Sequence, residues 1–314
     1  MNVFRNTTRL ATLALALVAA APARAGDVYL SLGDSLAFGY DPSAPNYLTP
    51  SYGDQGFVGH FADVLAAVNG GVRPAVLNLG VVGEQSTSFF DPTALSPTGP
   101  PRAWQLNKNY DGTGGALSQN DLMLSSIASL HAAGDHIGAV TLIFGANDIF
   151  ALLGSDAFKN ADPAAQAMLI GQTITAALTN YGTVLTELKT VAPEARVFLP
   201  GYFNPFPAAI DPTDHALYDE VLGFFNPNLK ALADNLGATY VDTYAPFVGH
   251  ELEYTNIASG DFHPNAAGYA VIGSRLGAAA VPEPSGLISL ATAIGAGAVA
   301  AAARRRASAR RPAA

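Results

Sequence analysis

The sequence predicts an α/β fold in which helices cover both faces of a five-stranded parallel sheet, giving a three-layer α/β/α sandwich. Short apolar runs alternate along the chain with longer stretches in which apolar residues recur at helical spacing. Each short run is nearly continuously apolar, which is typical of parallel strands that are buried on both faces. These observations favour a single α/β domain, and no internal repeat is detectable within it.

Five of the short runs are predicted strands, and five of the longer stretches are predicted helices. The strands are expected at residues 28–32, 75–79, 137–144, 196–199 and 239–243. The helices are expected at residues 57–68, 117–132, 164–191, 217–235 and 264–276. Residues 89–115 are rich in Pro, Gly, Thr and Asn and are predicted to form a long loop. A loop of that length in a compact domain is usually functional or mobile.

The first 25 residues have the composition of a secretory signal peptide. Arg5 and Arg9 form a positive region, residues 10–20 are apolar, and residues 23–25 read Ala-Arg-Ala, a small-x-small cleavage site. We therefore expect an exported protein whose mature chain begins near Gly26.

The C-terminal segment, residues 280–314, has the features of a membrane anchor. Pro282-Glu283-Pro284 precedes an uncharged stretch at residues 285–303, and five arginines follow between residues 304 and 311. The nineteen uncharged residues would span about 28 Å as a helix, close to the thickness of a bilayer core. The arginines favour a cytoplasmic end, which leaves everything before Pro282 on the outer side.

This order of features resembles the PEP-CTERM sorting signal of exopolysaccharide-producing Gram-negative bacteria. The resemblance implies a transient anchor in the inner membrane that an exosortase-type machinery cleaves, after which the protein reaches the cell surface or is secreted. An ordinary, uncleaved C-terminal anchor is the alternative. In both cases the protein would contact the membrane through this helix only.

Between its two ends the chain is strongly acidic and contains no cysteine. Residues 26–279 hold 24 Asp and Glu against eight Lys and Arg, a formal charge of −16. Such a surface repels phosphate backbones and anionic membranes, which argues against a nucleic-acid partner. The lack of cysteine excludes disulfides, thiolate metal sites and a cysteine nucleophile.

Polar residues follow the predicted strands at positions where parallel sheets bind their ligands. The clusters are Gly33-Asp34-Ser35-Leu36 after the first strand, Asn78-Leu79-Gly80 with Gly83 after the second, Gly145-Ala146-Asn147-Asp148 after the third, and Asp261-Phe262-His263-Pro264-Asn265 beyond the fifth. Because the carboxyl ends of parallel strands share one edge of the sheet, we expect these clusters to meet there.

In this order the four clusters resemble the sequence blocks of the GDSL, or SGNH, hydrolase family, and together they cover the middle of the chain. The resemblance implies a flavodoxin-like α/β/α domain at residues 26–279 and an ester hydrolase that needs no metal or organic cofactor. It also implies roles for five residues: Ser35 as nucleophile, His263 and Asp261 as the other triad members, and Gly83 and Asn147 as oxyanion donors.

The residue types fit this chemistry on physical grounds. A serine hydroxyl needs an adjacent base to act as a nucleophile, and imidazole titrates near neutral pH. The amides of Ser35 and Gly83 and the Asn147 carboxamide can donate to the oxygen on which negative charge grows. Taken singly, Ser35 could instead be a helix cap and Asn147 a turn residue. An α/β-hydrolase elbow is disfavoured, because Ala37 stands where the Gly-x-Ser-x-Gly pattern needs glycine.

The spacing of the acid departs from the family pattern. The family commonly has the acid three residues before the histidine, where this chain has Gly260, whereas Asp261 lies two residues before His263. One hypothesis is that Asp261 still orients the imidazole through a bent backbone, which Gly260 makes possible. The alternative is that a backbone carbonyl orients the ring and Asp261 is a solvated loop acid.

These features predict a serine esterase that forms an acyl-enzyme at Ser35. The substrate is either a lipid acyl ester or an acetylated carbohydrate. Four aromatic residues of the long loop are candidates for an acyl pocket, the alternative being that they only pin the loop to the domain: Phe89, Phe90, Trp104 and Tyr110. The alternative function is a non-catalytic extracellular matrix or surface-binding module that retains the fold. Such a module has no need of a complete Ser, Gly, Asn and His set.

Overall fold

The computed structural model describes residues 27–45, 47, 54–94, 104–110 and 117–281. By its contacts the chain divides into one unit at Met1–Ala278 and a second at Ala279–Ala314, of which only residues 279–281 are described. The predicted signal peptide and the predicted sorting signal from residue 282 onward lie outside the described residues. Within the described ranges, no helix is both long and apolar enough to cross a membrane.

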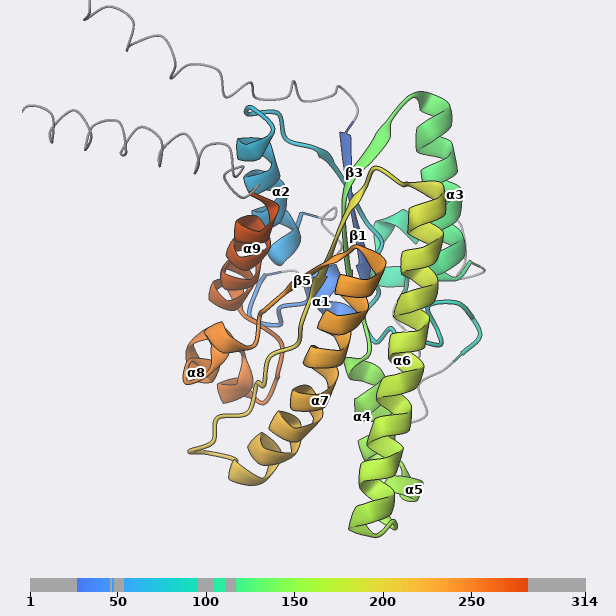
Figure 1. Ribbon diagram of the computed structural model, residues 1–314. Helices are drawn as coiled ribbons and strands as arrows, with labels where there is room; N and C mark the ends of the chain where they lie inside the picture. Colours follow the sequence, from blue (N-terminus) through green and yellow to red (C-terminus); the bar gives the residue numbers. More distant parts are fainter. Residues whose placement is uncertain (1–26, 46, 48–53, 95–103, 111–116, 282–314) are drawn as a thin grey trace, which may run out of the picture. The chain divides into compact units, whose positions relative to one another are not determined.

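A five-stranded sheet in which all strands are parallel forms the centre of the first unit, as predicted (Figure 1). The strand order is β2-β1-β3-β4-β5, which is the flavodoxin-like order. The strands are β1 (Asp27–Gly33), β2 (Ala75–Asn78), β3 (His136–Ile143), β4 (Arg196–Pro200) and β5 (Thr239–Val241). β1 and β3 are buried along most of their length, whereas the edge strands β2 and β5 are partly exposed.

Helices cover both faces of the sheet, which confirms the predicted three-layer sandwich. α2 (Phe57–Val68) and α9 (Ala266–Ala280) lie on one face; α3 (Gln119–Ala133), α6 (Pro163–Val191) and α7 (Pro212–Leu236) lie on the other (Figure 1). The connections contain the short helices α1 (Ser35–Phe38), α4 (Ala146–Gly154), α5 (Asp156–Lys159) and α8 (Glu251–Tyr254). They also contain 3₁₀ turns at Trp104–Leu106, Lys108–Tyr110, Ala245–Phe247 and Ile257–Ser259.

All five predicted helices form, and several of their starts differ from the prediction because a capping side chain sets the first residue. α7 begins at Pro212, before the predicted residue 217, because Asp211 accepts a hydrogen bond from the Asp214 N–H at 3.0 Å. The sequence does not predict α4, because nine residues are too few for a clear helical period.

Aromatic side chains fill the core on both sides of the sheet. Towards α2, Tyr29, Phe61 and Phe198 form edge-to-face pairs with ring centroids 5.1 and 5.2 Å apart. Towards α6, Phe144 packs against Tyr181 with centroids 4.2 Å apart, and the Phe144 N–H donates to the Tyr181 hydroxyl at 2.9 Å. The hydrogen bond from Phe144 to Tyr181 holds the carboxyl end of β3, after which α4 begins.

Candidate active site

Ser35 lies directly after β1, in a turn that requires glycine. Gly33 has a φ of +129°, and a Cβ at this position would lie 1.8 Å from the Ile143 carbonyl oxygen. Asp34 caps α1, because its carboxylate accepts a hydrogen bond from the Leu36 N–H at 2.9 Å. These contacts hold Ser35, which is 7% exposed, at the carboxyl edge of the sheet.

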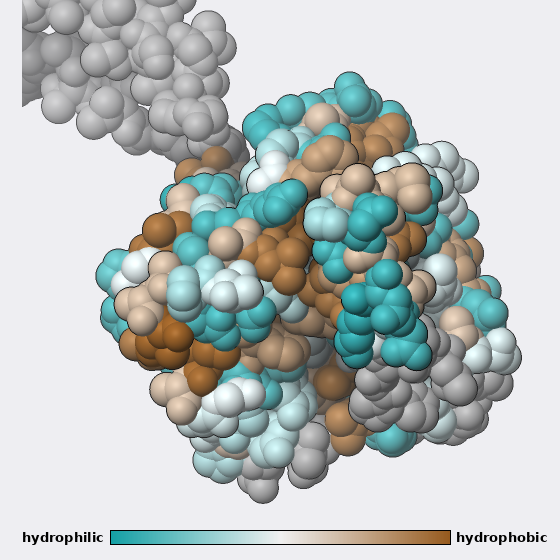
Figure 2. All heavy atoms as spheres, turned by 90° about the horizontal axis from the view of Figure 1, so that it is seen from below, coloured by the Kyte–Doolittle hydropathy of each residue, from teal (hydrophilic) through white to brown (hydrophobic). Residues whose placement is uncertain are grey.

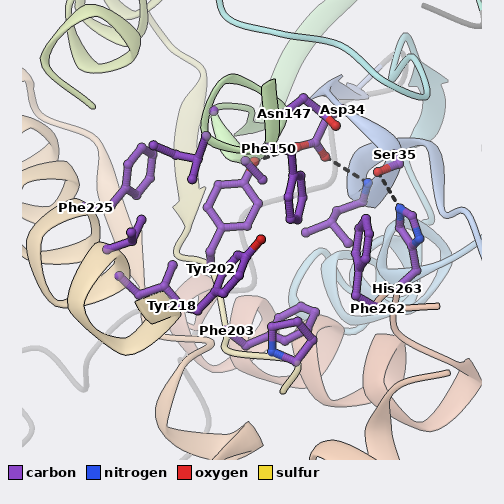
Figure 3. Close-up of a pocket in the computed structure, with 17 residues that line it drawn as sticks. Asp34, Ser35, Asn147, Phe150, Tyr202, Phe203, Tyr218, Phe225, Phe262 and His263 are labelled. Carbon is purple, nitrogen blue, oxygen red and sulfur yellow. Dashed lines mark hydrogen bonds between the residues drawn. The ribbon is translucent and has the colours of Figure 1, made fainter. Parts of the chain in front are cut away.

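The side chains of Ser35, His263 and Asp261 form a continuous hydrogen-bonded row. His263 Nε2 lies 2.8 Å from Ser35 Oγ (Figure 3), and His263 Nδ1 lies 2.8 Å from Asp261 Oδ1. Because an ionised carboxylate only accepts hydrogen bonds, Nδ1 carries the proton of the neutral ring and Nε2 accepts from the serine hydroxyl. This is the arrangement that general-base activation of a serine requires.

Asp261 reaches the imidazole despite its short spacing because the backbone bends before it. Gly260 has a φ of +82°, in the left-handed region, at the end of a 3₁₀ turn. Asp261 Oδ1 accepts from both the Nδ1 and the backbone N–H of His263, each at 2.8 Å. In the structure, therefore, the group that faces Nδ1 is the carboxylate and not a backbone carbonyl.

The charge of Asp261 follows from these contacts. Burial raises the pKa of its carboxyl, but the two hydrogen bonds from His263 and the charge of that ring outweigh burial and leave the pKa below its ordinary value. The carboxylate is consequently ionised at neutral pH, as the assigned tautomer of His263 requires.

The segment that carries His263 is anchored on both sides. Thr255 and Pro264 form an antiparallel bridge, and the Asn256 N–H donates to the His263 carbonyl at 2.9 Å. Asn265 Oδ1 accepts from the first turn of α9 at 2.9 Å, which moves the start of this helix from the predicted residue 264 to residue 266.

Asn147 lies in the first turn of α4, and it lines the same cavity as Ser35 (Figure 3). Its Nδ2 donates to the Glu84 carbonyl at 2.9 Å, which leaves a second N–H on the same nitrogen. Gly83, the residue before Glu84, has a φ of +81° and is not among the described residues that line the cavity. The structure thus brings Asn147 to Ser35 and places Gly83 beside the hydrogen-bond partner of Asn147.

Two carboxyls, the buried Asp34 and the partly buried Asp148, brace the loops of the site. Asp34 accepts a hydrogen bond from the Tyr202 hydroxyl at 2.5 Å, and burial raises its pKa to about 6 although its hydrogen bonds oppose this. Asp148 accepts from the N–H and the hydroxyl of Ser86 at 2.8 and 2.6 Å, and burial raises its pKa as well. The environments of Asp34 and Asp261 therefore shift their pKa values in opposite directions.

A mostly apolar pocket opens beside Ser35, and its apolar walls with a few polar groups are typical of small-molecule sites. The face at the carboxyl ends of the strands is hollowed, and apolar side chains show in the hollows (Figure 2). The aromatic side chains of the pocket are Phe150, Tyr202, Phe203, Tyr218, Phe225 and Phe262 (Figure 3). Its aliphatic side chains include Leu36, Ile149, Pro205, Val221 and Leu222.

The prediction that aromatic residues of the long loop shape an acyl pocket is wrong, because none of the four lines this pocket. Phe89 and Tyr110 are fully buried in the core, where Tyr110 donates to the Leu79 carbonyl at 3.0 Å. Phe90 and Trp104 are also absent from the described lining. Phe89 and Tyr110 therefore pin the loop to the domain instead of shaping the pocket.

Two sequence signals point to the true lining residues. Tyr202 and Phe203 follow β4 and so lie at the same edge of the sheet as the residues that follow β1 and β3. Tyr218, Leu222 and Phe225 recur at four- and three-residue spacing along α7, and therefore share one face of that helix. The sequence alone does not show that this face of α7 meets the edge of the sheet that carries Ser35.

Residues 31–271 match the GDSL-like lipase/acylhydrolase family. The spore germination lipase LipC of Bacillus licheniformis is 33% identical over 104 residues, which are 32% of this chain and 45% of that protein. The chain therefore spans less than half the length of this curated relative.

Solved structures with low sequence identity share the fold. The lipase Lip_vut3 from a goat rumen metagenome aligns with a TM-score of 0.54 and 19% identity, over 81% of this chain and 97% of that chain. A catalytic mutant of the acetylxylan esterase Axe2 from Geobacillus stearothermophilus aligns with a TM-score of 0.50 and 16% identity, over 81% of this chain and 94% of that chain. At such identities the likeness shows the fold alone.

Proposed function

Because the chain belongs to the GDSL-like lipase/acylhydrolase family, a family of ester-bond hydrolases, we propose that it hydrolyses carboxylic esters through an acyl-enzyme at Ser35. The observation that carries this proposal is the row from Asp261 through His263 to Ser35, in which both contacts are 2.8 Å long. A non-catalytic binding module, the alternative function, has no use for a serine held on an oriented imidazole at a pocket wall.

In the first half-reaction the Ser35 hydroxyl attacks the ester carbonyl carbon, and its proton passes to His263 Nε2. The Asp261 carboxylate holds Nδ1–H and stabilises the imidazolium. The N–H groups of Ser35 and Gly83 and the second N–H of Asn147 donate to the oxygen that gains negative charge. His263 then gives its proton to the leaving oxygen, the alcohol departs, and Ser35 is left acylated.

In the second half-reaction water takes the place of the alcohol. His263 removes a proton from the water, and the hydroxide attacks the acyl carbonyl carbon. The same donors stabilise the second oxyanion. The bond to Ser35 Oγ then breaks, the serine regains its proton from His263, and the carboxylic acid leaves.

We also propose that the acyl part of the substrate is an apolar chain longer than acetyl. The ionisable acid and base in the described lining are Asp34 and His263, and both are engaged by neighbouring protein groups. The remaining walls are mainly aromatic and aliphatic, and an acetyl group would leave most of them without a contact. Each additional buried methylene contributes about 0.8 kcal/mol, roughly fourfold in kcat/KM.

Covalent labelling tests the acyl-enzyme. A fluorophosphonate probe is expected to label the wild-type protein and to fail on Ser35→Ala, while Ser31→Ala, a change in β1 outside the cavity lining, retains labelling. Unchanged labelling of Ser35→Ala would remove Ser35 from the mechanism.

A series of nitrophenyl esters tests the substrate class. We expect kcat/KM to rise by about fourfold per methylene from acetyl to hexanoyl, and acetyl release from acetylated glycans to be slow. The highest kcat/KM on acetyl esters, together with rapid acetyl release from glycans, would favour carbohydrate esters and contradict the acyl-chain proposal.

For the two ends of the chain we propose export through residues 1–25 and a transient anchor in residues 280–314, cleaved by an exosortase-type machinery. The N-terminal support is the signal-peptide composition of residues 1–25. The C-terminal support is the order of a Pro-Glu-Pro motif, an apolar stretch and an arginine cluster. The two ends agree, because each independently places the hydrolase domain on the outer side of the membrane.

A further inference from the structure

The ring of Tyr40 packs against the imidazole of His263. The two ring centroids are 4.6 Å apart and the ring planes are inclined by 56°. Phe262 also stacks on this imidazole, with centroids 4.7 Å apart and planes inclined by 28°. Two aromatic rings therefore lie within 5 Å of the group that becomes a cation in the proposed reaction.

The fold holds Tyr40 in this position through its backbone. Its N–H donates to the Ser35 carbonyl at 2.9 Å, and its own carbonyl accepts from the buried Tyr269 hydroxyl at 2.8 Å. Its ring also meets the Tyr47 ring edge-on, with centroids 5.2 Å apart. Tyr40 is thus tied directly to the nucleophile turn while its ring contacts the base.

We propose that Tyr40 is a positioning residue that holds the His263 ring towards Ser35 and stabilises its imidazolium form. This inference rests on the proposed function, because the stability of the imidazolium affects the rate only if His263 acts as the base. The face of an aromatic ring attracts a cation, and close ring packing restricts rotation of the imidazole. Tyr40 is not among the described residues that line the substrate pocket, whereas Phe262 is, so Tyr40 acts through His263 and not on the substrate.

The other ionisable groups near the imidazole are left in place when Tyr40 is changed. Asp261 on the same segment and Asp34 at the start of α1 both interact with the charge of His263. Asp41 is connected less directly, because Asn256 Nδ2 donates to Asp41 at 3.0 Å and to the His263 carbonyl at 3.3 Å. Burial, Tyr47 and Asp261 raise the pKa of Tyr40 itself, so its phenol is neutral at neutral and acidic pH.

The test compares Tyr40→Phe with Tyr40→Leu by the pH profile of kcat/KM on one nitrophenyl ester. Phenylalanine keeps the ring, whereas leucine keeps an apolar side chain against the imidazole and removes the π face. We expect Tyr40→Phe to stay within about twofold of wild type. We expect Tyr40→Leu to lose about tenfold in kcat with little change in KM. We also expect the acid limb of its kcat/KM profile to move down by about 0.5–1 pH unit, because the imidazolium loses a stabilising contact.

The outcomes separate this inference from the proposed function. If Tyr40→Leu keeps the pH profile and kcat of Tyr40→Phe, the positioning role is wrong even though the enzyme hydrolyses esters. If the wild-type protein hydrolyses no ester, or if Ser35→Ala is as active as wild type, the proposed function itself fails. Tyr40→Met replaces Tyr40→Leu if thermal melting shows that the leucine variant is unfolded, with the same expected loss and the same contradicting result.

Discussion

The Tyr202 hydroxyl donates a 2.5 Å hydrogen bond to Asp34, joining two residues that are 168 positions apart in the sequence. Tyr202 follows β4 and lines the pocket, while Asp34 caps α1 just before Ser35. One contact thus connects the pocket wall to the turn that carries Ser35. Asp34 is 1% exposed, and its buried position raises its pKa to about 6.

This raised pKa predicts a pH dependence of stability that Asp34→Asn removes. The folded protein binds the Asp34 proton more tightly than the unfolded chain does, so the stabilising contribution is complete below about pH 4 and is lost as pH rises through about 6. The free energy of unfolding of wild type, relative to Asp34→Asn, is expected to fall by roughly 3 kcal/mol over this range. Urea unfolding of both proteins across this range measures the difference. A constant difference would show that Asp34 titrates normally.

Asn147→Ala is expected to fold normally and to lose about 10²- to 10³-fold in kcat, the usual effect of removing one oxyanion donor. KM is expected to change little, because the interaction strengthens in the transition state. Asn180→Ala is the matched control, since Asn180 also belongs to this region, where it donates to Ser86 Oγ at 3.1 Å, but does not line the cavity. A loss confined to KM would show instead that Asn147 binds the substrate.

Asp261→Asn tests the two-residue spacing of the acid. The carboxamide cannot hold Nδ1–H as a carboxylate does, so kcat is expected to fall by up to about 10⁴-fold through the wrong tautomer and a less stable imidazolium. The control is Asp242→Asn, a loop acid that accepts from the Tyr244 N–H outside the cavity lining. A loss of less than about tenfold, with His263→Ala inactive, would remove Asp261 from the triad.

Gly33→Ala is expected to destabilise the protein severely, by more than about 3 kcal/mol, because the new Cβ would collide with the Ile143 backbone in a left-handed conformation. Gly71→Ala is the control: its φ is +93°, but nothing lies within 4 Å of its Cβ, so only the backbone strain of about 1–2 kcal/mol is expected. Thermal or urea unfolding compares the two. Equal stability of the variants would contradict a steric requirement at Gly33.

Deletion of residues 282–314 tests the proposed anchor. Asp261, His263 and Ser35 all precede residue 282 in the sequence. The truncated protein is therefore expected to be soluble and to retain the esterase activity of the full-length chain. Comparing the two proteins in membrane and soluble fractions measures the anchor. Failure of the purified truncated protein to fold would show that the segment belongs to the hydrolase domain.

Much of the fold could be predicted from the sequence because helical and strand periods are local properties of the chain. The apolar run at residues 28–32 lies within β1, the run at 137–144 extends one residue beyond the end of β3, and the long helical pattern at residues 164–191 lies within α6. The short α4 and the early start of α7 escaped prediction, because a nine-residue helix has little periodicity and a capping side chain leaves only a weak signal.

The alternation of elements and the polar clusters that follow the strands, including Ser35, Asn147 and His263, could be read from the amino-acid sequence. Three features became visible in the folded structure: Asp261 faces Nδ1, Tyr202 and α7 form the pocket wall, and Tyr40 packs on the imidazole. Secondary structure follows from neighbouring residues, whereas a contact between distant side chains depends on backbone bends and on how separate elements pack.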